Sequence, residues 1–333
     1  MSALSSAAGE RRTSDLFAIH AQLLSIATFF AVMVILFTVS SATFLTAGNL
    51  LNLIRQAAPI LIVASAMTFV ITTGGIDLSV GSTVALINAL AAILLQVALP
   101  WPLVVIGLLA IGAAIGVVQG WFIAYQGIQA FIVTLAGLSV LRGVALLMTQ
   151  GFSIPISTDL GFVQIGRAWI LGVPAPAWIA LLVAISGFLV LAHTRYGRYV
   201  TAIGANQEAA RRAGIATRLV ILWVYVLTGL ASAVAGIIIA ARLGSGSSNA
   251  AVGFELDVIA AVVLGGTSLM GGRGSMLGTI LGALTIAVIG NGLILSHVSP
   301  FFTQIVTGLI ILLAVWLNAR VFSRITGLAG RRT

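Results

Sequence analysis

The chain lacks two residue types altogether. It has no cysteine, which excludes disulfides and metal or iron–sulfur sites held by thiolates. It also has no lysine, so all 16 of its basic residues are arginine. A phosphate-binding P-loop needs a lysine that reaches the nucleotide phosphates. The chain therefore cannot provide an ATP site of that kind.

Charged residues are scarce as well. They make up 7% of the 333 residues, whereas hydrophobic residues make up 60%, and the mean hydropathy is +1.19. A soluble domain has about a quarter charged residues. A chain with so few cannot cover itself with a water-facing surface, so we expect membrane lipid to be its main solvent. The 37 glycines suit helices that pack closely in a membrane.

Residues for catalysis or nucleic-acid binding are also few. The three histidines, His20, His193 and His297, are far apart, and neither HExxH nor GxSxG occurs. We therefore expect no enzyme activity, no metal site, no cofactor and no nucleic-acid partner. The net charge of +9 comes from arginines scattered between apolar runs, which is typical of membrane topology signals.

Long apolar runs predict an all-α, polytopic membrane helix bundle that forms a single domain over residues 1–333. A spanning helix needs about 20 apolar residues, and about ten runs qualify. They lie near 20–42, 50–73, 79–99, 103–125, 130–149, 174–193, 219–241, 256–271, 275–296 and 301–320. Glycine and polar residues shorten or interrupt the third and eighth runs.

The arginines predict how the chain is oriented. Ten crossings from a cytoplasmic N-terminus place twelve of them on the cytoplasmic side: Arg11, Arg12, Arg195, Arg198, Arg211, Arg212, Arg218, Arg273, Arg320, Arg324, Arg331 and Arg332. This positive-inside bias favours an even number of spans. Both termini are then cytoplasmic, with tails over residues 1–18 and 321–333.

Two loops between the predicted spans are long. Gly151–Pro176, on the predicted outer face, is long enough to form a small external structure. On the inner face, the loop 194–218 contains a predicted short helix over 206–213, with Asn206 as its N-cap and Gly214 as its stop. A short amphipathic helix between spans suits a docking element, or it lies on anionic lipid.

A glycine-rich stretch occurs twice, at 74–82 and at 265–275. Each interrupts the chain at the inner end of a span that runs from outside to inside. Glycine-broken segments at matching places point to a transport site, and their equal orientation favours parallel repeats. The predicted helix-break residues are Gly74, Gly75, Gly81, Gly265, Gly266, Gly271 and Gly272.

Asp77 is the most informative acid, because it lies between two apolar runs. A charge at the membrane centre costs about 2.5–3.5 kcal/mol on insertion scales. Asp77 therefore either lines a transport path or caps the third helix. Neutral polar residues inside apolar runs could bind a neutral, hydroxyl-bearing substrate along a path or join helices to one another. The predicted path residues are Asp77, Ser79, Asn88, Gln119 and Asn291. Glu255 and Asp257 could line an external vestibule or be ordinary helix N-terminal acids.

Three motifs together resemble the permease subunit of ribose-type ABC sugar importers. They are Thr72 to Ser82, Glu255 to Gly274, and His193 to Tyr199 with the 204–206 and 209–215 stretches. The resemblance runs from about Ser40 to Leu317. Val258, Met270 and Arg273 depart from the commoner pattern without disturbing it.

This resemblance implies an ATP-driven importer of a monosaccharide, such as ribose or xylose, that works by alternating access in the bacterial inner membrane. It implies two ATP-binding cassette subunits, a periplasmic sugar-binding protein and a second, identical or different, permease chain as partners. The residues that match the family's ATPase-coupling segment are Asn206, Glu208, Arg211, Arg212 and Gly214. An ion-coupled secondary sugar carrier or a channel is the alternative; a membrane enzyme that acts on lipid is disfavoured because clustered acid–base residues are missing.

Overall fold

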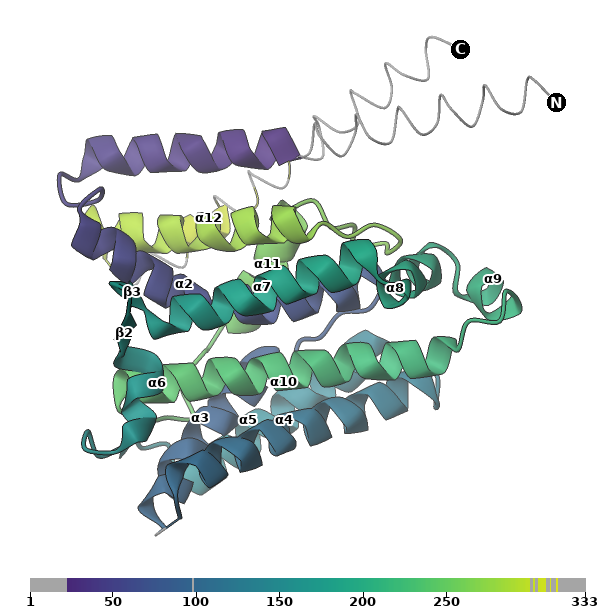
Figure 1. Ribbon diagram of the computed structural model, residues 1–333, viewed down its shortest axis with the longest axis horizontal. Coiled ribbons are helices and arrows are strands. Elements are labelled where there is room, and N and C mark those ends of the chain that lie inside the picture. The colour runs from purple at the N-terminus through teal and green to yellow at the C-terminus, as the bar shows by residue number, and fades with distance from the viewer. Residues whose placement is uncertain are drawn as a thin grey trace.

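The computed structural model describes residues 23–97 and 99–299, together with 302, 305–309, 312 and 316. The predicted tails, 1–18 and 321–333, and much of the predicted tenth span lie outside these residues. Long helices run side by side between two ends of the molecule (Figure 1). One end has α8 (Arg195–Ala205) and α9 (Gln207–Arg212), and the other has two small sheets. We call them the α9 end and the sheet end.

Seven helices in the described part of the chain are long and apolar enough to cross a membrane. They are Leu23–Ser40, α2 (Ala47–Thr72), α4 (Trp101–Ala124), α5 (Ala130–Thr149), α7 (Ala175–His193), α10 (Thr217–Leu243) and α12 (Met276–Leu295). The prediction of a polytopic helical membrane protein is therefore confirmed. The count of ten spans stays a prediction.

Two helices are shorter than the predicted spans that they replace. α3 (Val80–Gln96) has 17 residues, and α11 (Phe254–Leu264) has 11. At 1.5 Å per residue, α11 is about 16 Å long, roughly half of a 30 Å hydrocarbon core. The predicted run 256–271 passes the end of α11, which stops at Gly265, one of the predicted helix breaks; apolar residues return only at Leu269 and Met270.

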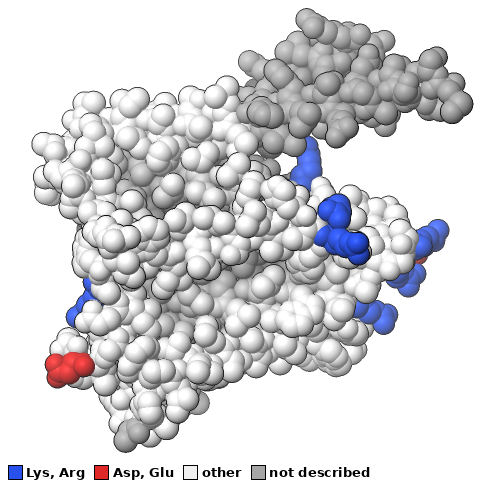
Figure 2. Space-filling view, in the orientation of Figure 1, with Lys and Arg blue, Asp and Glu red and all other residues white. Residues whose placement is uncertain are grey.

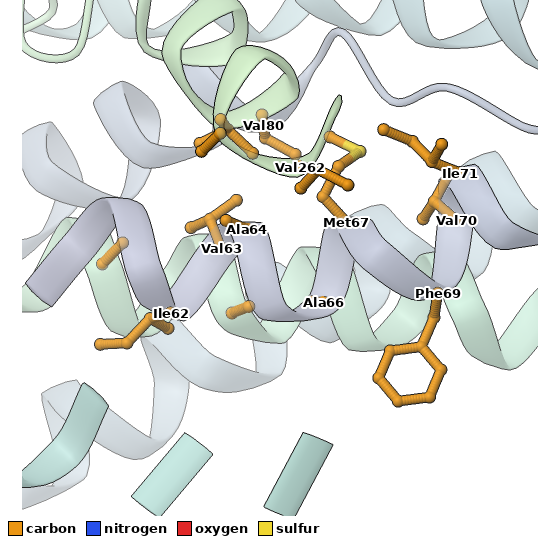
Figure 3. Packing of buried hydrophobic residues seen from close by; sticks show 14 of the residues in the cluster. Ile62, Val63, Ala64, Ala66, Met67, Phe69, Val70, Ile71, Val80 and Val262 are labelled. Atoms are coloured by element: carbon orange, nitrogen blue, oxygen red, sulfur yellow. The ribbon is translucent and has the colours of Figure 1, made fainter. Parts of the chain in front are cut away.

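The helices differ in how deeply they are buried. The apolar window of α10 is 83% buried and that of α2 is 72% buried, against 11% for α5. α2 and α10 therefore form the centre of the bundle, and α5 lies at its periphery. In Figure 3, Val80 of α3 and Val262 of α11 pack against the face of α2 that contains Met67, whereas Phe69 points to the opposite side. A helix that is apolar all round needs such neighbours on every side.

The uncharged sides of the molecule suit a lipid environment. Figure 2 shows a broad belt without charged side chains, and basic residues gathered mainly at the α9 end. Exposed large apolar residues cover the peripheral helices, such as Leu147 of α5 and Leu182 of α7, which are 80% and 66% exposed. Contiguous apolar surface of this kind is rare on soluble proteins, so we take this belt as the lipid-facing surface.

The loop 151–176 forms a small structure at the sheet end, as predicted. It contains β1 (Ile154–Pro155), η1 (Gly161–Val163), α6 (Gln164–Arg167), β2 (Trp169–Ile170) and β3 (Val173–Pro174). β2 pairs with β3, and β1 pairs with β4 (Ser245–Gly246), both antiparallel. The β1–β4 pair joins this loop to the connection between α10 and α11.

Candidate functional site

The predicted short helix of the 194–218 loop is present as α9. The Asn206 side chain caps it by accepting a hydrogen bond from the Ala209 N–H at 2.9 Å, and Gly214 follows with φ of +83°. Such a positive φ is readily adopted by glycine. α9 is thus a short helix with a defined start and a defined stop.

The charged side chains of α9 are exposed and paired with each other. Glu208 accepts hydrogen bonds from Arg211 and Arg212, each at 3.0 Å. These bonds hold the pKa of the Glu208 carboxyl below its usual value, and the bond from Arg211 contributes most. Both guanidinium groups stay largely open to solvent. This surface suits a partner that carries acidic groups.

Helix α8, which precedes α9, was not predicted from the sequence. Thr194 caps it, because its hydroxyl accepts a hydrogen bond from the Gly197 N–H at 3.2 Å. A threonine before a helical stretch is a recognisable N-cap signal, so Thr194 is the sequence feature that could have indicated α8.

The two glycine-rich stretches meet each other beside the end of α8. The Gly272 N–H donates a 2.9 Å hydrogen bond to the Thr72 carbonyl, at the end of α2. A Cβ on Gly271 would lie 2.8 Å from the Gly204 carbonyl oxygen and 3.0 Å from the Gly74 nitrogen. A Cβ on Gly204 would collide with the Thr72 carbonyl oxygen. We call the set Thr72, Gly74, Gly204, Gly271 and Gly272 the glycine junction.

The remaining predicted helix-break glycines lie beside the junction or apart from it. Gly75 follows Gly74 and faces Tyr225 of α10. Gly265 ends α11 and packs on Gly278 of α12, and Gly266 follows with φ of +88°. Gly81 lies inside α3, where a Cβ would collide with the Glu255 carboxylate of α11. The starts of the two short helices therefore face each other.

Three of the five predicted path residues form one buried hydrogen-bonded group. Asp77 is 2% exposed; its Oδ1 accepts from the Ser79 N–H at 2.9 Å and from the Ser79 hydroxyl at 2.7 Å. Gln119 of α4 donates to the Ser79 hydroxyl oxygen at 2.8 Å. From α10, the Thr228 hydroxyl shares its proton between Asp77 Oδ2 at 3.1 Å and the Tyr225 carbonyl of its own helix at 2.9 Å. The group thus joins the start of α3 to α4 and α10.

Sequence reasoning missed two residues that lie at this group. Thr228 sits in a long apolar run, and its hydroxyl is a polar group that the run itself could have flagged. Tyr225, one turn earlier, is 1% exposed. Its hydroxyl faces Gly75 and has no hydrogen-bond partner among the described residues. A buried hydroxyl without a partner is costly, so this side of the group is under-satisfied.

The other two predicted path residues lie elsewhere. The Asn88 Oδ1 of α3 accepts a 2.7 Å hydrogen bond from the Ser247 N–H, next to β4. Asn291 of α12 exchanges two 3.0 Å amide hydrogen bonds with Asn49 of α2. Each joins two segments of the bundle, and the structure does not bring either to Asp77.

Comparison with known proteins gives a consistent set of relatives. Residues 49–315 match the family described as "Branched-chain amino acid transport system / permease component". The chain is 45% identical to the ribose import permease protein RbsC of Escherichia coli strain K12, over 85% of this chain and 89% of that protein. It is 43% identical to RbsC of Bacillus subtilis strain 168, over 87% and 90%.

A third relative differs in its named sugar. The chain is 35% identical to the xylose transport system permease protein XylH of E. coli K12, over 88% of this chain and 90% of that protein. The predicted resemblance is thereby confirmed. No solved structure matches the chain.

Proposed function

Since the chain belongs to the family of branched-chain amino acid transport system permease components, we propose that it is the permease subunit of an ATP-driven monosaccharide importer. A pentose such as ribose or xylose is the first candidate for the sugar. The observation that carries this proposal is the kinship with ribose and xylose permeases over at least 85% of the chain. Both named sugars are neutral polyols, which suits a membrane region with few charges.

We propose that the α9 end faces the cytoplasm of a bacterial inner membrane, with ten spans and both termini inside. Five arginines of the 194–218 loop gather at this end: Arg195, Arg198, Arg211, Arg212 and Arg218. Positive residues favour the cytoplasmic side. The small sheets then lie outside, where a periplasmic sugar-binding protein would dock on Gly151–Pro176 and on residues 244–255.

We assign ATP hydrolysis to two separate subunits, because this chain has no lysine for a P-loop. Each would dock on α9 of one permease chain in a dimer, through Asn206, Glu208, Arg211, Arg212 and Gly214. The exposed guanidinium groups of α9 support this assignment.

The glycine junction offers a route from the docked ATPase to the membrane breaks. α9 follows directly on α8, and Gly204 near the end of α8 packs on Thr72 and Gly272. A displacement of α9 would therefore reach both glycine-rich stretches at once. ATP drives alternating access only by favouring one conformation of the permease over the other.

Radiolabelled ribose and xylose uptake into proteoliposomes tests the proposal. The chain alone should take up neither sugar, and the chain with its ATPase and binding protein should take up one of them when ATP is present. Uptake by the chain alone would overturn the subunit assignment and indicate a carrier or channel.

The coupling assignment has its own matched variants. Arg211→Ala/Arg212→Ala should lose ATPase association and sugar-stimulated ATP hydrolysis, because both guanidinium groups lie on α9. Arg195→Ala/Arg198→Ala removes the same charge from exposed positions of α8 and should keep most of both. Unchanged sugar-stimulated hydrolysis in the first variant would reject α9 as the docking element.

A further inference from the structure

The connection between α10 and α11, residues 244–253, enters the bundle as irregular backbone. After β4 it passes Arg142 of α5, which lies about two turns, or roughly 10 Å, before Thr149 at the sheet end of that helix. It ends at α11, whose first turn faces Gly81. Irregular backbone at membrane depth is tolerated only where protein groups satisfy its N–H and C=O groups.

Side chains of two helices provide those groups. Asn88 of α3 accepts from the Ser247 N–H at 2.7 Å. Thr149 of α5 donates to the Ser248 hydroxyl at 2.9 Å. Arg142 contributes most, because its Nη1 donates to the Ser248 carbonyl at 2.5 Å and to the Ala250 carbonyl at 2.9 Å. Its Nη2 lies 3.4 Å from the Ala251 carbonyl.

We infer that Arg142 is a positioning residue that holds the 247–251 segment inside the bundle and thereby fixes where α11 begins. An arginine within an apolar spanning helix is expected to have a specific partner. Here the partners are three main-chain carbonyls, those of residues 248, 250 and 251, which match the several donors of a planar guanidinium. The segment leads to Glu255 in the first turn of α11.

Lysine is a poor substitute at this place. Its ammonium group is a compact point charge on a flexible stem, whereas the guanidinium donors are spread over a rigid fork. One ammonium therefore cannot reach carbonyls of residues 248, 250 and 251 as a fixed fork does. Arg142→Lys keeps the positive charge but loses the planar guanidinium, so part of the 247–251 segment should lose its hydrogen bonds.

Cysteine labelling tests the inference, because the natural chain has no cysteine. The reporter is Ser248→Cys, at a position that is 0% exposed. The control reporter is Ala91→Cys on the buried face of α3, also 0% exposed. Each is combined with Arg142→Gln, with Arg142→Lys, or with Arg198→Gln as a matched loss of an exposed arginine, and a small water-soluble maleimide is applied to open membranes.

We expect Arg142→Gln to speed labelling of the Ser248→Cys reporter by about tenfold or more, through local opening. The Ala91→Cys reporter should stay protected, and Arg198→Gln should change neither. An unchanged Ser248→Cys rate would overturn the inference. If Arg142→Gln speeds labelling of both reporters, the Arg142→Lys variant is used to judge the inference. Faster labelling of Ser248→Cys alone in that variant supports the inference, and any other pattern overturns it.

The consequence for transport rests on the proposed function, whereas the labelling does not. In the complete transporter, Arg142→Gln should reduce uptake with the ATPase still bound. If the complete transporter with unsubstituted Arg142 takes up no sugar, the proposed function is contradicted. The labelling result still tests the role of Arg142 in that case.

Discussion

The glycine junction and the 247–251 segment are both interruptions of a helical bundle, but they are held together by different means. At the junction, backbone packs on backbone, and the Gly272 N–H pairs directly with the Thr72 carbonyl. Along the segment, the side chains of Asn88, Arg142 and Thr149 hold the chain from outside.

The difference follows from what each neighbour can offer. Helix backbones are internally bonded and have free groups only at their ends, and the junction lies where α2 and α8 end. The segment runs beside the middle of α3 and the last turns of α5. At Asn88 and Arg142 the helix backbone is internally bonded, so side chains must provide the bonds. The junction should therefore be sensitive to added atoms, and the segment to lost polar groups.

The largest effect should come from adding one carbon at the junction. In Gly204→Ala, the new Cβ would collide with the Thr72 carbonyl and crowd the Gly272 nitrogen. Overpacking of this kind costs typically about 1–3 kcal/mol, and occasionally more. Rigid backbone atoms cannot move aside as a flexible side chain does, so we expect a cost at the upper end, measured by unfolding in detergent.

Gly143→Ala in α5 is the matched control. Nothing lies within 4 Å of a Cβ at that position, and alanine stabilises a helix interior by about 0.5–1 kcal/mol relative to glycine. The two substitutions should therefore have opposite signs. Equal stability of both variants would show that the junction is not tightly packed.

The next effect comes from removing a polar group at the segment. Asn88→Ala deletes the acceptor of the half-buried Ser247 N–H. An unsatisfied buried donor costs about 1–3 kcal/mol, so we expect a cost near the lower end. It should also speed labelling of the Ser248→Cys reporter. Asn291→Ala is the control, because it removes a similar amide at the α2–α12 contact and leaves Asn49 bonded to the Phe44 carbonyl. Faster reporter labelling in both variants would count against a local role for Asn88.

A smaller effect is expected where α10 meets the start of α3. Thr228→Val removes the hydroxyl that donates to Asp77 and should cost about 0.5–1.5 kcal/mol, the net value of one hydrogen bond. Asp77 keeps both Ser79 donors, so the loss is partial. The Thr228 hydroxyl also bonds the Tyr225 carbonyl of its own helix at 2.9 Å, so the matched control is Thr285→Val, whose lost hydroxyl bonds the Leu281 carbonyl of its own helix at 2.7 Å. Equal unfolding midpoints for the two variants would argue that the Thr228–Asp77 contact is unimportant.

Local features of this fold could be predicted from the sequence. The caps of α9 are side-chain and glycine signals at fixed spacing, and the long apolar runs predicted the seven spanning helices. The end of α11 was marked by the predicted break at Gly265, but the apolar run was drawn on to residue 271 because Leu269 and Met270 are apolar again. Hydropathy measures transfer to lipid and does not detect a backbone turn.

Contacts between segments that are distant in the chain could not be predicted from the sequence. The duplicated glycine stretches indicated two breaks, but nothing in either indicated that they meet at Gly204. Arg142 was conspicuous in its apolar run, yet its partners are backbone carbonyls, which every residue has. The grouping of Asp77 with Thr228 depends on how α10 packs against α3, and no local pattern specifies that packing.

The smallest effect should be that of pH on α9. Bonds from Arg211 and Arg212 keep the pKa of Glu208 below its usual value of 4.5. Because the folded-state pKa is the lower one, these pairs contribute fully above the unfolded value and are lost only as pH falls through the folded value. Glu208 stays charged between pH 7 and pH 5.5, because even the lower of these values is roughly one unit above the usual pKa of a glutamate.

Hydrogen exchange of residues 207–212, corrected for intrinsic rates, should therefore be the same at both pH values. Added salt should speed it slightly, since exposed pairs are screened. Glu208→Gln should speed exchange of residues 207–212 as added salt does, and salt should then have no further effect on the exchange rate of this variant. A steep rise in exchange as the pH falls from 7 to 5.5 would mean that a titrating group other than Glu208 stabilises α9. The α9 end would then depend on a polar contact, as the 247–251 segment does.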